Sequence, residues 1–172
     1  EAYLEYLGKH DVLTQLRNRT FYVEELNRIT RKGPWPLSVI TIDLNGLKLI
    51  NDEHGHAAGD ALLRRVGEVL AKAVEASACA ARVGGDEFTV LLPGIDERGA
   101  LGVQERITSL VDISNQFYPG QHLSLAIGTA SCTSGDQVEA TLHRADKAMY
   151  VEKQRYYQEK PNERRGVGCF VA

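Results

Sequence analysis

Long apolar runs are missing from this sequence. No window approaches the roughly 18 consecutive apolar residues that a membrane-spanning helix needs, and the opening EAYLEYLGKHD lacks the basic and apolar regions of a signal peptide. We therefore predict a cytoplasmic domain that makes no membrane contact of its own. Because the first residue is Glu rather than Met, we also expect a longer protein, whose upstream region could carry a membrane anchor.

An excess of basic residues is also missing. The 20 Lys and Arg residues stand against 23 Asp and Glu residues, which gives a formal net charge of −3. A protein that binds nucleic acid needs a basic face against the phosphates. The charge balance therefore argues against a DNA or RNA partner.

Cysteine is scarce. The three cysteines, Cys79, Cys132 and Cys169, are odd in number, far apart in the sequence and in no metal-ligand pattern. They are typical of reduced thiols in a cytosolic protein, so the sequence predicts neither a disulfide framework nor a zinc site.

What the sequence does have is 172 residues, of which 43% are hydrophobic, enough for one domain with a core of its own. We predict a linker helix over residues 1–10, which would lead from an absent upstream region, a domain over residues 11–160, and a tail over residues 161–172 with no predicted element.

Hydrophobic periodicity predicts the elements of this domain. Helices are expected at 20–33, 59–76, 96–113 and 136–160, strands at 37–45 and 122–132, and a strand–turn–strand hairpin at 79–92. The Gly84-Gly85 pair in the hairpin is of the type that a two-residue turn with positive φ favours. Helices and strands alternate without an internal repeat, so the sequence predicts an α/β or α+β fold, in which helices cover a sheet.

Three polar segments come at the predicted strand ends. Asp43 closes the first strand, the residues GGDE form the hairpin turn, and NGLKLINDEHGHAAGD follows the first strand. Ligands gather at such strand ends in helix-covered sheets. Carboxylates from two strands would repel each other unless a hard divalent cation such as Mg²⁺ lay between them, which would leave positions for phosphate oxygens. The alternative is an exposed acidic turn that only aids solubility.

The two acidic residues of the turn are expected to differ in role. In an extended strand Asp86 shares a face with Phe88, and Glu87 shares the other face with Thr89. One acid should therefore face Asp43 across a metal, and the other should position a substrate hydroxyl or take its proton. The bare backbone of Gly84 and Gly85 could approach a phosphate closely.

Four segments resemble the GGDEF domain, the catalytic module of bacterial diguanylate cyclases. They are DVLTQLRNR, with Gln15 where a glycine is usual, DLNGLKLINDEHGHAAGD, the signature RVGGDEF, and RADKAMYVEK near the end. Together they span about residues 11–153 in the family's order. The resemblance implies a central, mostly antiparallel sheet of the nucleotidyl-cyclase and polymerase-palm type, covered by helices.

The resemblance also implies a reaction. Two GTP molecules would condense into cyclic di-GMP with release of two pyrophosphates, at the interface of a homodimer, and an upstream sensory domain would control the enzyme. The expected cofactor is Mg²⁺, with Mn²⁺ as an alternative. Phosphoryl transfer of this kind depends on positioning and on a cation more than on covalent chemistry.

By the same resemblance, each site residue has an expected role. Asp43 and Asp86 would ligate Mg²⁺ with the carbonyl of Leu44, and Glu87 would lie beside the metal. The catalytic base stays open between Asp86 and Glu87. The remaining expected contacts are Asn51 and Asp60 with guanine, Lys48 and Lys153 with phosphates, and Gly84 and Gly85 with the substrate through their backbone; Lys48 is also placed among the catalytic groups. For each lysine, a solvated surface position is the alternative.

Two departures from the family pattern matter. Many members carry an Arg-x-x-Asp product-inhibition site, but Glu75 and Ala78 occupy those positions here, so we expect no feedback inhibition through it. The family usually has an arginine on a phosphate where this chain has Tyr157. The second departure supports an alternative function, a non-catalytic GGDEF module that binds GTP or dimerises to regulate a linked domain. A cyclase with an adenine substrate is disfavoured by Asp60, since adenine lacks the guanine donors.

Overall fold

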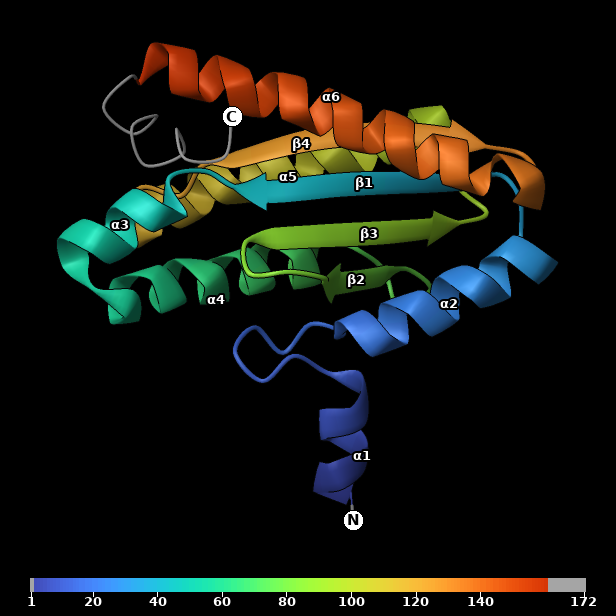
Figure 1. Cartoon of the computed structure of the whole chain (residues 1–172), viewed down its shortest axis with the longest axis horizontal. Coiled ribbons are helices and arrows are strands. Elements are labelled where there is room, and N and C mark those ends of the chain that lie inside the picture. The colour runs from blue at the N-terminus through green and yellow to red at the C-terminus, as the bar shows by residue number, and fades with distance from the viewer. Residues whose placement is uncertain (1, 161–172) are drawn as a thin grey trace, which may run out of the picture.

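A computed structural model describes residues 2–160 of the chain (Figure 1). In chain order the elements are α1 (Ala2–Lys9), α2 (Arg19–Lys32), β1 (Leu37–Leu44), α3 (Leu47–His54), α4 (His56–Ala73), β2 (Cys79–Arg82), β3 (Glu87–Pro93), α5 (Glu97–Phe117), β4 (Leu125–Cys132), a 3₁₀ turn (Gly135–Gln137) and α6 (Val138–Glu159). The predicted tail 161–172, with Cys169, lies outside the described residues. Within residues 2–160, no helix is both long and apolar enough to cross a membrane.

The four strands found in residues 2–160 form one sheet in the order β2-β3-β1-β4, and every neighbouring pair is antiparallel. The strand β1 lies in the middle, paired with β3 on one side and with β4 on the other. The predicted class, an antiparallel sheet covered by helices, is confirmed. In Figure 1 the tip of β1, the β2–β3 turn and α3 lie at the same end of the sheet.

One face of the sheet carries large apolar side chains and packs against α4 and α5. This cluster includes Ile40, Ile42, Leu44, Phe88, Val90 and Leu92 from the strands and Leu62, Leu63, Val66, Leu70, Val103 and Ile107 from the helices. A buried face of this kind supplies most of the hydrophobic stabilisation of a small domain.

The opposite face packs against α2 and α6 and holds a second cluster, with Leu37, Val39, Leu91, Ala130 and Ala145 among its members. The side chains of β4 on this face are all small, namely Ala126, Gly128, Ala130 and Cys132. A Cβ atom on Gly128 would lie 2.1 Å from the carbonyl oxygen of Ala145. The backbone of α6 therefore lies directly on β4.

The structure corrects several of the predicted elements. The helix predicted at 59–76 spans His56–Ala73, and the strand predicted at 122–132 begins at Leu125. The segment after β1 contains the helix α3, which was not predicted, because its short apolar pattern of Leu47 and Ile50 gives a weak periodic signal. The helix α5 ends at Phe117 rather than near residue 113. The hairpin turn is not a two-residue turn with positive φ, since neither Gly84 nor Gly85 is in the left-handed region. Instead, the N–H groups of Val83 and Gly84 both donate to the carbonyl of Glu87.

Candidate metal and nucleotide site

Three carboxylates meet at the end of β1. Asp43 is opposite Glu87 in the antiparallel register of β1 and β3, so the two side chains leave the sheet on the same face. Asp86 lies in the turn before β3, and its backbone carbonyl accepts the N–H of Leu44 at 3.0 Å. One ligand oxygen from each of the three acids lies within 4.8 Å of the others. Acidic groups from two strands and one turn are thus brought into a single cluster.

The expected division of roles between Asp86 and Glu87 does not follow from their positions. The division assumed that both residues belong to one extended strand, but β3 begins at Glu87. Because Asp86 precedes the strand, the alternation of faces does not apply to it, and its carboxylate turns toward Asp43. Both acids therefore lie within reach of the same cation.

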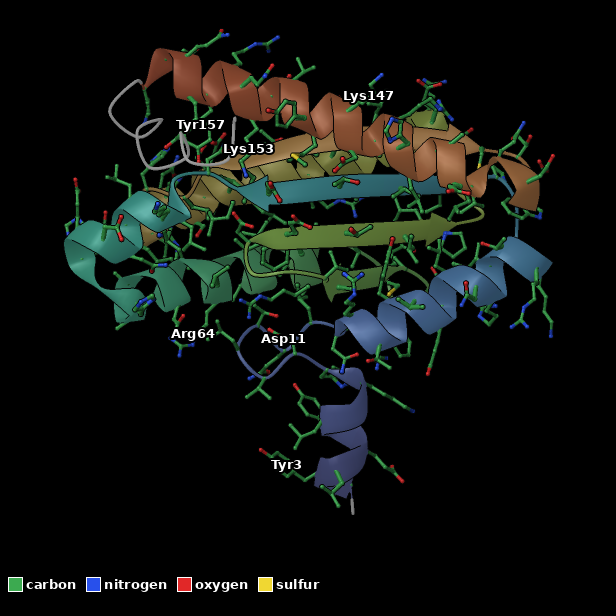
Figure 2. The ribbon with its side chains drawn as sticks, viewed as in Figure 1. Tyr3, Asp11, Arg64, Lys147, Lys153 and Tyr157 are labelled. Atoms are coloured by element: carbon green, nitrogen blue, oxygen red, sulfur yellow. The ribbon has the colours of Figure 1, made fainter. Side chains whose placement is uncertain are left out.

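Lys153 reaches this cluster from α6. Its Nζ donates to Oδ2 of Asp43 at 2.6 Å and lies 3.9 Å from Oδ2 of Asp86. Burial lowers the pKa of Lys153, but its hydrogen bond to Asp43 and the attraction of both acids outweigh burial, so its pKa lies above the usual value. The lysine is charged and partly neutralises the cluster. Figure 2 shows Lys153 and Tyr157 on the side of α6 toward the sheet, with Lys147 on the outer side.

Asp43 is the buried member of the cluster, only 5% exposed. Its pKa is raised from 3.8 to about 6, chiefly because of burial; Lys153 opposes the rise, and the charges of Asp86 and Glu87 contribute to it. A carboxylate with such a pKa is held at a cost in free energy near neutral pH. A second cation beside it would remove that cost.

The residues fit a hard divalent cation. The Oδ1 atom of Asp43 is buried and has no hydrogen-bond partner among residues 2–160, and an unsatisfied buried carboxylate oxygen is unfavourable unless something binds it. Oxygen ligands from carboxylates and a backbone carbonyl are the set that Mg²⁺ and Mn²⁺ prefer. Asp43, Asp86 and Glu87 could therefore hold such an ion.

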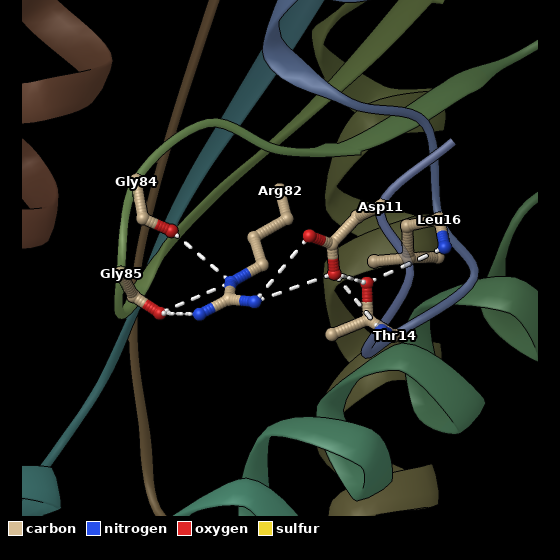
Figure 3. Close-up of polar contacts among 6 residues, drawn as sticks. All are labelled: Asp11, Thr14, Leu16, Arg82, Gly84 and Gly85. Atoms are coloured by element: carbon tan, nitrogen blue, oxygen red, sulfur yellow. Dashed lines mark hydrogen bonds and ion pairs between the residues drawn. The ribbon is translucent and has the colours of Figure 1, made fainter. Parts of the chain in front are cut away.

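The glycine turn is held from behind by Arg82, which sequence reasoning did not single out (Figure 3). Its guanidinium donates to the carbonyls of Gly84 at 3.2 Å and of Gly85 at 2.8 and 3.1 Å. Its Nη1 lies 3.4 Å from Asp11, and that carboxylate accepts the N–H and the hydroxyl of Thr14 at 2.9 and 2.7 Å. The opening segment and the hairpin turn are thus joined through one arginine.

The two glycines leave one side of the turn open. Gly85 is exposed, and a Cβ atom built on it would meet no atom of the described residues within 4 Å. A Cβ on Gly84 would lie 3.3 Å from that of Glu87. Because Arg82 binds both carbonyls, the turn keeps its shape without side chains of its own. A ligand can approach the backbone of Gly85 from solvent.

The residues expected to contact guanine lie on α3 and α4. Within the described part of the chain, Oδ1 of Asn51 is buried without a hydrogen-bond partner, and a Cβ on Gly59 would lie 1.8 Å from it. Gly59 therefore provides the space in which Asn51 sits. Asp60, the next residue, is partly exposed, and Lys48 is exposed on α3. The structure brings Asn51 up against α4, whereas the cation that pairs with the carboxylate cluster, within the part of the chain that the structure describes, is Lys153 and not Lys48.

Tyr157 was singled out only as a replacement for an arginine, yet it has a definite contact. It lies inside α6, and its hydroxyl accepts the N–H of Gly46 at 3.1 Å in a buried position. The spacing of four residues from Lys153 was the available signal, since it places both side chains on one face of a helix.

A family model and known proteins match most of this chain. The family model described as "Diguanylate cyclase, GGDEF domain" matches residues 8–158. The chain is 38% identical over 152 residues to diguanylate cyclase DosC of Escherichia coli strain K12, covering 84% of this chain and 33% of that protein. It is 33% identical over 153 residues to diguanylate cyclase A of Treponema denticola, covering 84% of this chain and 41% of that protein. The chain therefore spans well under half the length of these relatives.

Solved structures share the fold. The GGDEF domain of YfiN (TpbB) from Pseudomonas aeruginosa is 34% identical with a TM-score of 0.71, over 83% of this chain and 92% of that one. The coiled coil and GGDEF domain of DgcB from Caulobacter crescentus, in complex with c-di-GMP, has a TM-score of 0.78 at 24% identity, over 89% and 84% of the two chains. With the signature intact at residues 82–88 and a family match over most of its length, the chain belongs to the GGDEF domain family of diguanylate cyclases.

Proposed function

We propose that this domain condenses two GTP molecules into cyclic di-GMP as one half of a homodimer. The observation that carries the proposal is the carboxylate cluster, in which Asp43, Asp86 and Glu87 offer oxygens within 4.8 Å of one another and Oδ1 of Asp43 is buried with no partner in the residues that the structure describes. The family membership and relatives named diguanylate cyclase support it.

Each half-reaction is a phosphoryl transfer. The 3′-hydroxyl oxygen of one GTP bonds to the α-phosphorus of the other, the bond from that phosphorus to the β-phosphate bridge breaks, and pyrophosphate leaves. Asp86 or Glu87 accepts the hydroxyl proton. A second transfer, in which the 3′-hydroxyl oxygen of the other GTP bonds to the α-phosphorus of the first, closes the ring and releases the second pyrophosphate. A divalent cation held by Asp43, Asp86, Glu87 and the carbonyl of Leu44 would neutralise charge that develops on the phosphate oxygens.

The chain's other residues bind and orient the nucleotide. Lys153, already at the cluster, and Lys48 supply positive charge for the triphosphate. Asn51 and Asp60 offer an amide and a carboxylate to the edge of guanine, whose N–H groups adenine does not share. The open backbone at Gly85 leaves room for the phosphates.

Gly59→Ala tests the guanine side of the site. A Cβ there would lie 1.8 Å from Oδ1 of Asn51, so the side chain must move and GTP affinity should fall by about tenfold or more, the scale of one lost hydrogen bond in a buried site. Gly102→Ala is the matched control, because Gly102 is also helical and a Cβ on it would meet nothing within 4 Å. Equal GTP dissociation constants for the two variants would contradict the assignment of Asn51.

The proposed reaction is tested by incubating the protein with Mg²⁺ and either GTP or ATP and identifying the products by mass spectrometry. We expect cyclic di-GMP from GTP only, with a rate per molecule that rises with protein concentration because dimers form by mass action. If GTP yields no cyclic dinucleotide at any protein concentration, the reaction is refuted.

A second candidate function is regulatory binding without catalysis. It is favoured by Tyr157, which takes the place where the family usually has a phosphate-binding arginine and whose hydroxyl already contacts Gly46. The same incubation separates the two functions, since this candidate predicts GTP binding without product. The residues Glu75 and Ala78 argue against a c-di-GMP receptor that acts through the product-inhibition site, so added cyclic di-GMP should leave the initial rate unchanged.

A further inference from the structure

The last two turns of α6 form a polar extension of an apolar face. Ala145, Met149, Lys153 and Tyr157 follow one another at intervals of four residues, which places them along one side of the helix. Ala145 and Met149 are buried over β4, where Gly128 allows the close approach. Because α6 packs closely against β4 there, Lys153 and Tyr157, which lie farther along the same side of the helix, are placed over the end of β1 (Figure 2).

Tyr157 uses its hydroxyl to hold the turn between β1 and α3. The residue is only 8% exposed, and its hydroxyl accepts the N–H of Gly46 at 3.1 Å. Gly46 has φ 74° and ψ 13°, a left-handed conformation, and it precedes α3 without a side-chain cap. A buried N–H without a partner is costly, so the tyrosine oxygen stabilises this turn conformation.

The turn stands between the two parts of the nucleotide site. Before it are Asp43 and the carbonyl of Leu44, and after it begins α3, whose first N–H groups have no partner within the helix. Asn45 fixes the turn on its other side, through its N–H to the carbonyl of Ser124 at 2.8 Å and its Nδ2 to the hydroxyl of Ser124 at 3.1 Å. On the side of α6, the hydroxyl of Tyr157 holds the turn through the N–H of Gly46.

We infer that Tyr157 is a positioning residue for the triphosphate: its hydroxyl holds Gly46, and with it the first amides of α3, in the shape that receives phosphate oxygens. This inference rests on the proposed function, because it assumes that a guanine nucleotide binds here. Tyr157 would act through its neutral hydroxyl, so this role does not require the positive charge of an arginine. The helix α6 then controls both the metal ligand Asp43, through Lys153, and the phosphate turn, through Tyr157.

The contact is tested first without nucleotide, by amide hydrogen exchange of Tyr157→Phe. This substitution removes only the hydroxyl, so the ring should keep its packing. We expect faster exchange of the Gly46 amide than in the wild type, because its hydrogen-bond acceptor is removed, with the amides of the sheet unchanged. Tyr150→Phe is the matched control, because Tyr150 lies on the same helix and is 49% exposed. Unchanged exchange of the Gly46 amide in Tyr157→Phe would overturn the inference.

The role is tested next by binding, with Mg²⁺ and a GTP analogue whose α–β bridge cannot be cleaved. Loss of one neutral hydrogen bond should weaken binding by about 3- to 10-fold, while the affinity for guanosine, which has no phosphates, should stay at the wild-type value. Equal weakening for the analogue and for guanosine would indicate a merely structural role and overturn the inference, as would no weakening of analogue binding.

The two proposals can fail separately. If the wild type binds the GTP analogue but makes no cyclic di-GMP, the proposed reaction fails and the positioning role is still decided by the binding measurements. If the wild type does not bind the analogue at all, the proposed function and the positioning role are both refuted, whatever the exchange rates show of the Tyr157 contact.

Discussion

The face of the sheet under α4 and α5 carries large aliphatic side chains to its end, whereas the face under α6 becomes small and polar toward the candidate site. Along β1, Ile40, Ile42 and Leu44 point to the first face, while the second runs from Leu37 and Val39 through Thr41 to Asp43. The first face gains stability from apolar burial. The second face buries less apolar area and gains less stability, but its small side chains let α6 bring Lys153 close to three carboxylates.

A large apolar truncation on the α4–α5 face should have the greatest effect on stability and the least on the site. Leu92, 1% exposed, lies at the end of β3 away from the carboxylates. We expect Leu92→Ala to lower the free energy of unfolding by about 4 kcal/mol, measured by urea denaturation. At a temperature where the variant is still folded, its affinity for GTP should match the wild type. A large loss of affinity would show that the two faces are not separable.

Because Asp43 is buried on the α6 face, we expect the free energy of unfolding to depend on pH in the absence of divalent cations. The pKa of Asp43 is raised from 3.8 in the unfolded chain to about 6 in the folded one. Its protonated form is therefore favoured by folding, and this contribution is fully present below about pH 4 and is lost as the pH rises through 6. The loss amounts to about 3 kcal/mol, because one pKa unit corresponds to about 1.4 kcal/mol.

Urea denaturation between pH 4 and 7 measures this loss, with Asp43→Asn as the comparison. The variant should lack the decrease that the wild type shows. Added Mg²⁺ should restore wild-type stability at pH 7 more than at pH 5, because the cation needs the ionised carboxylate. Parallel curves for the two proteins would show that Asp43 is not held at such a cost.

Loss of the close packing of α6 on β4 should have the next largest effect on the free energy of unfolding. In Gly128→Ala the new Cβ would lie 2.1 Å from the carbonyl oxygen of Ala145 and 2.3 Å from the N of Met149. Since both are backbone atoms, the helix must move, at a cost of about 2 kcal/mol in unfolding free energy. Lys153 and Tyr157 move with the helix, so affinity for GTP should fall as well. Thermal unfolding and nucleotide titration measure the two effects, and lost stability with unchanged affinity would separate α6 from the site.

The smallest effect is expected in the opening segment, beside the α4–α5 face. Gln15 has φ 62°, where a non-glycine residue is strained. We expect Gln15→Gly to raise the free energy of unfolding by about 0.5 to 1 kcal/mol, since relief of the strain exceeds the added freedom of the unfolded chain. The activity should not change. A decrease in stability would mean that the Gln15 side chain makes a contact that outweighs its backbone strain.

The sequence predicted the sheet, most of the helices and the position of the acidic turn, because hydrophobic periodicity and strand-end residues are local signals. It did not predict α3, whose eight residues give too short a pattern. It also predicted that Asp86 belongs to the strand and follows its alternation of faces, but β3 begins at Glu87. The contacts of Arg82 with Gly85 and of Tyr157 with Gly46 could not be predicted in the same way, because the tertiary packing of the turns sets them.

The central claim is that the carboxylate cluster at the end of β1 is the metal site of a cyclase. Its most direct test is the initial rate of cyclic di-GMP formation by Asp86→Asn, measured against Asp146→Asn, which removes an exposed acid from α6. We predict that Asp86→Asn makes no product above the enzyme-free background at saturating GTP and Mg²⁺, while Asp146→Asn retains the wild-type rate. A wild-type rate from Asp86→Asn would contradict the account.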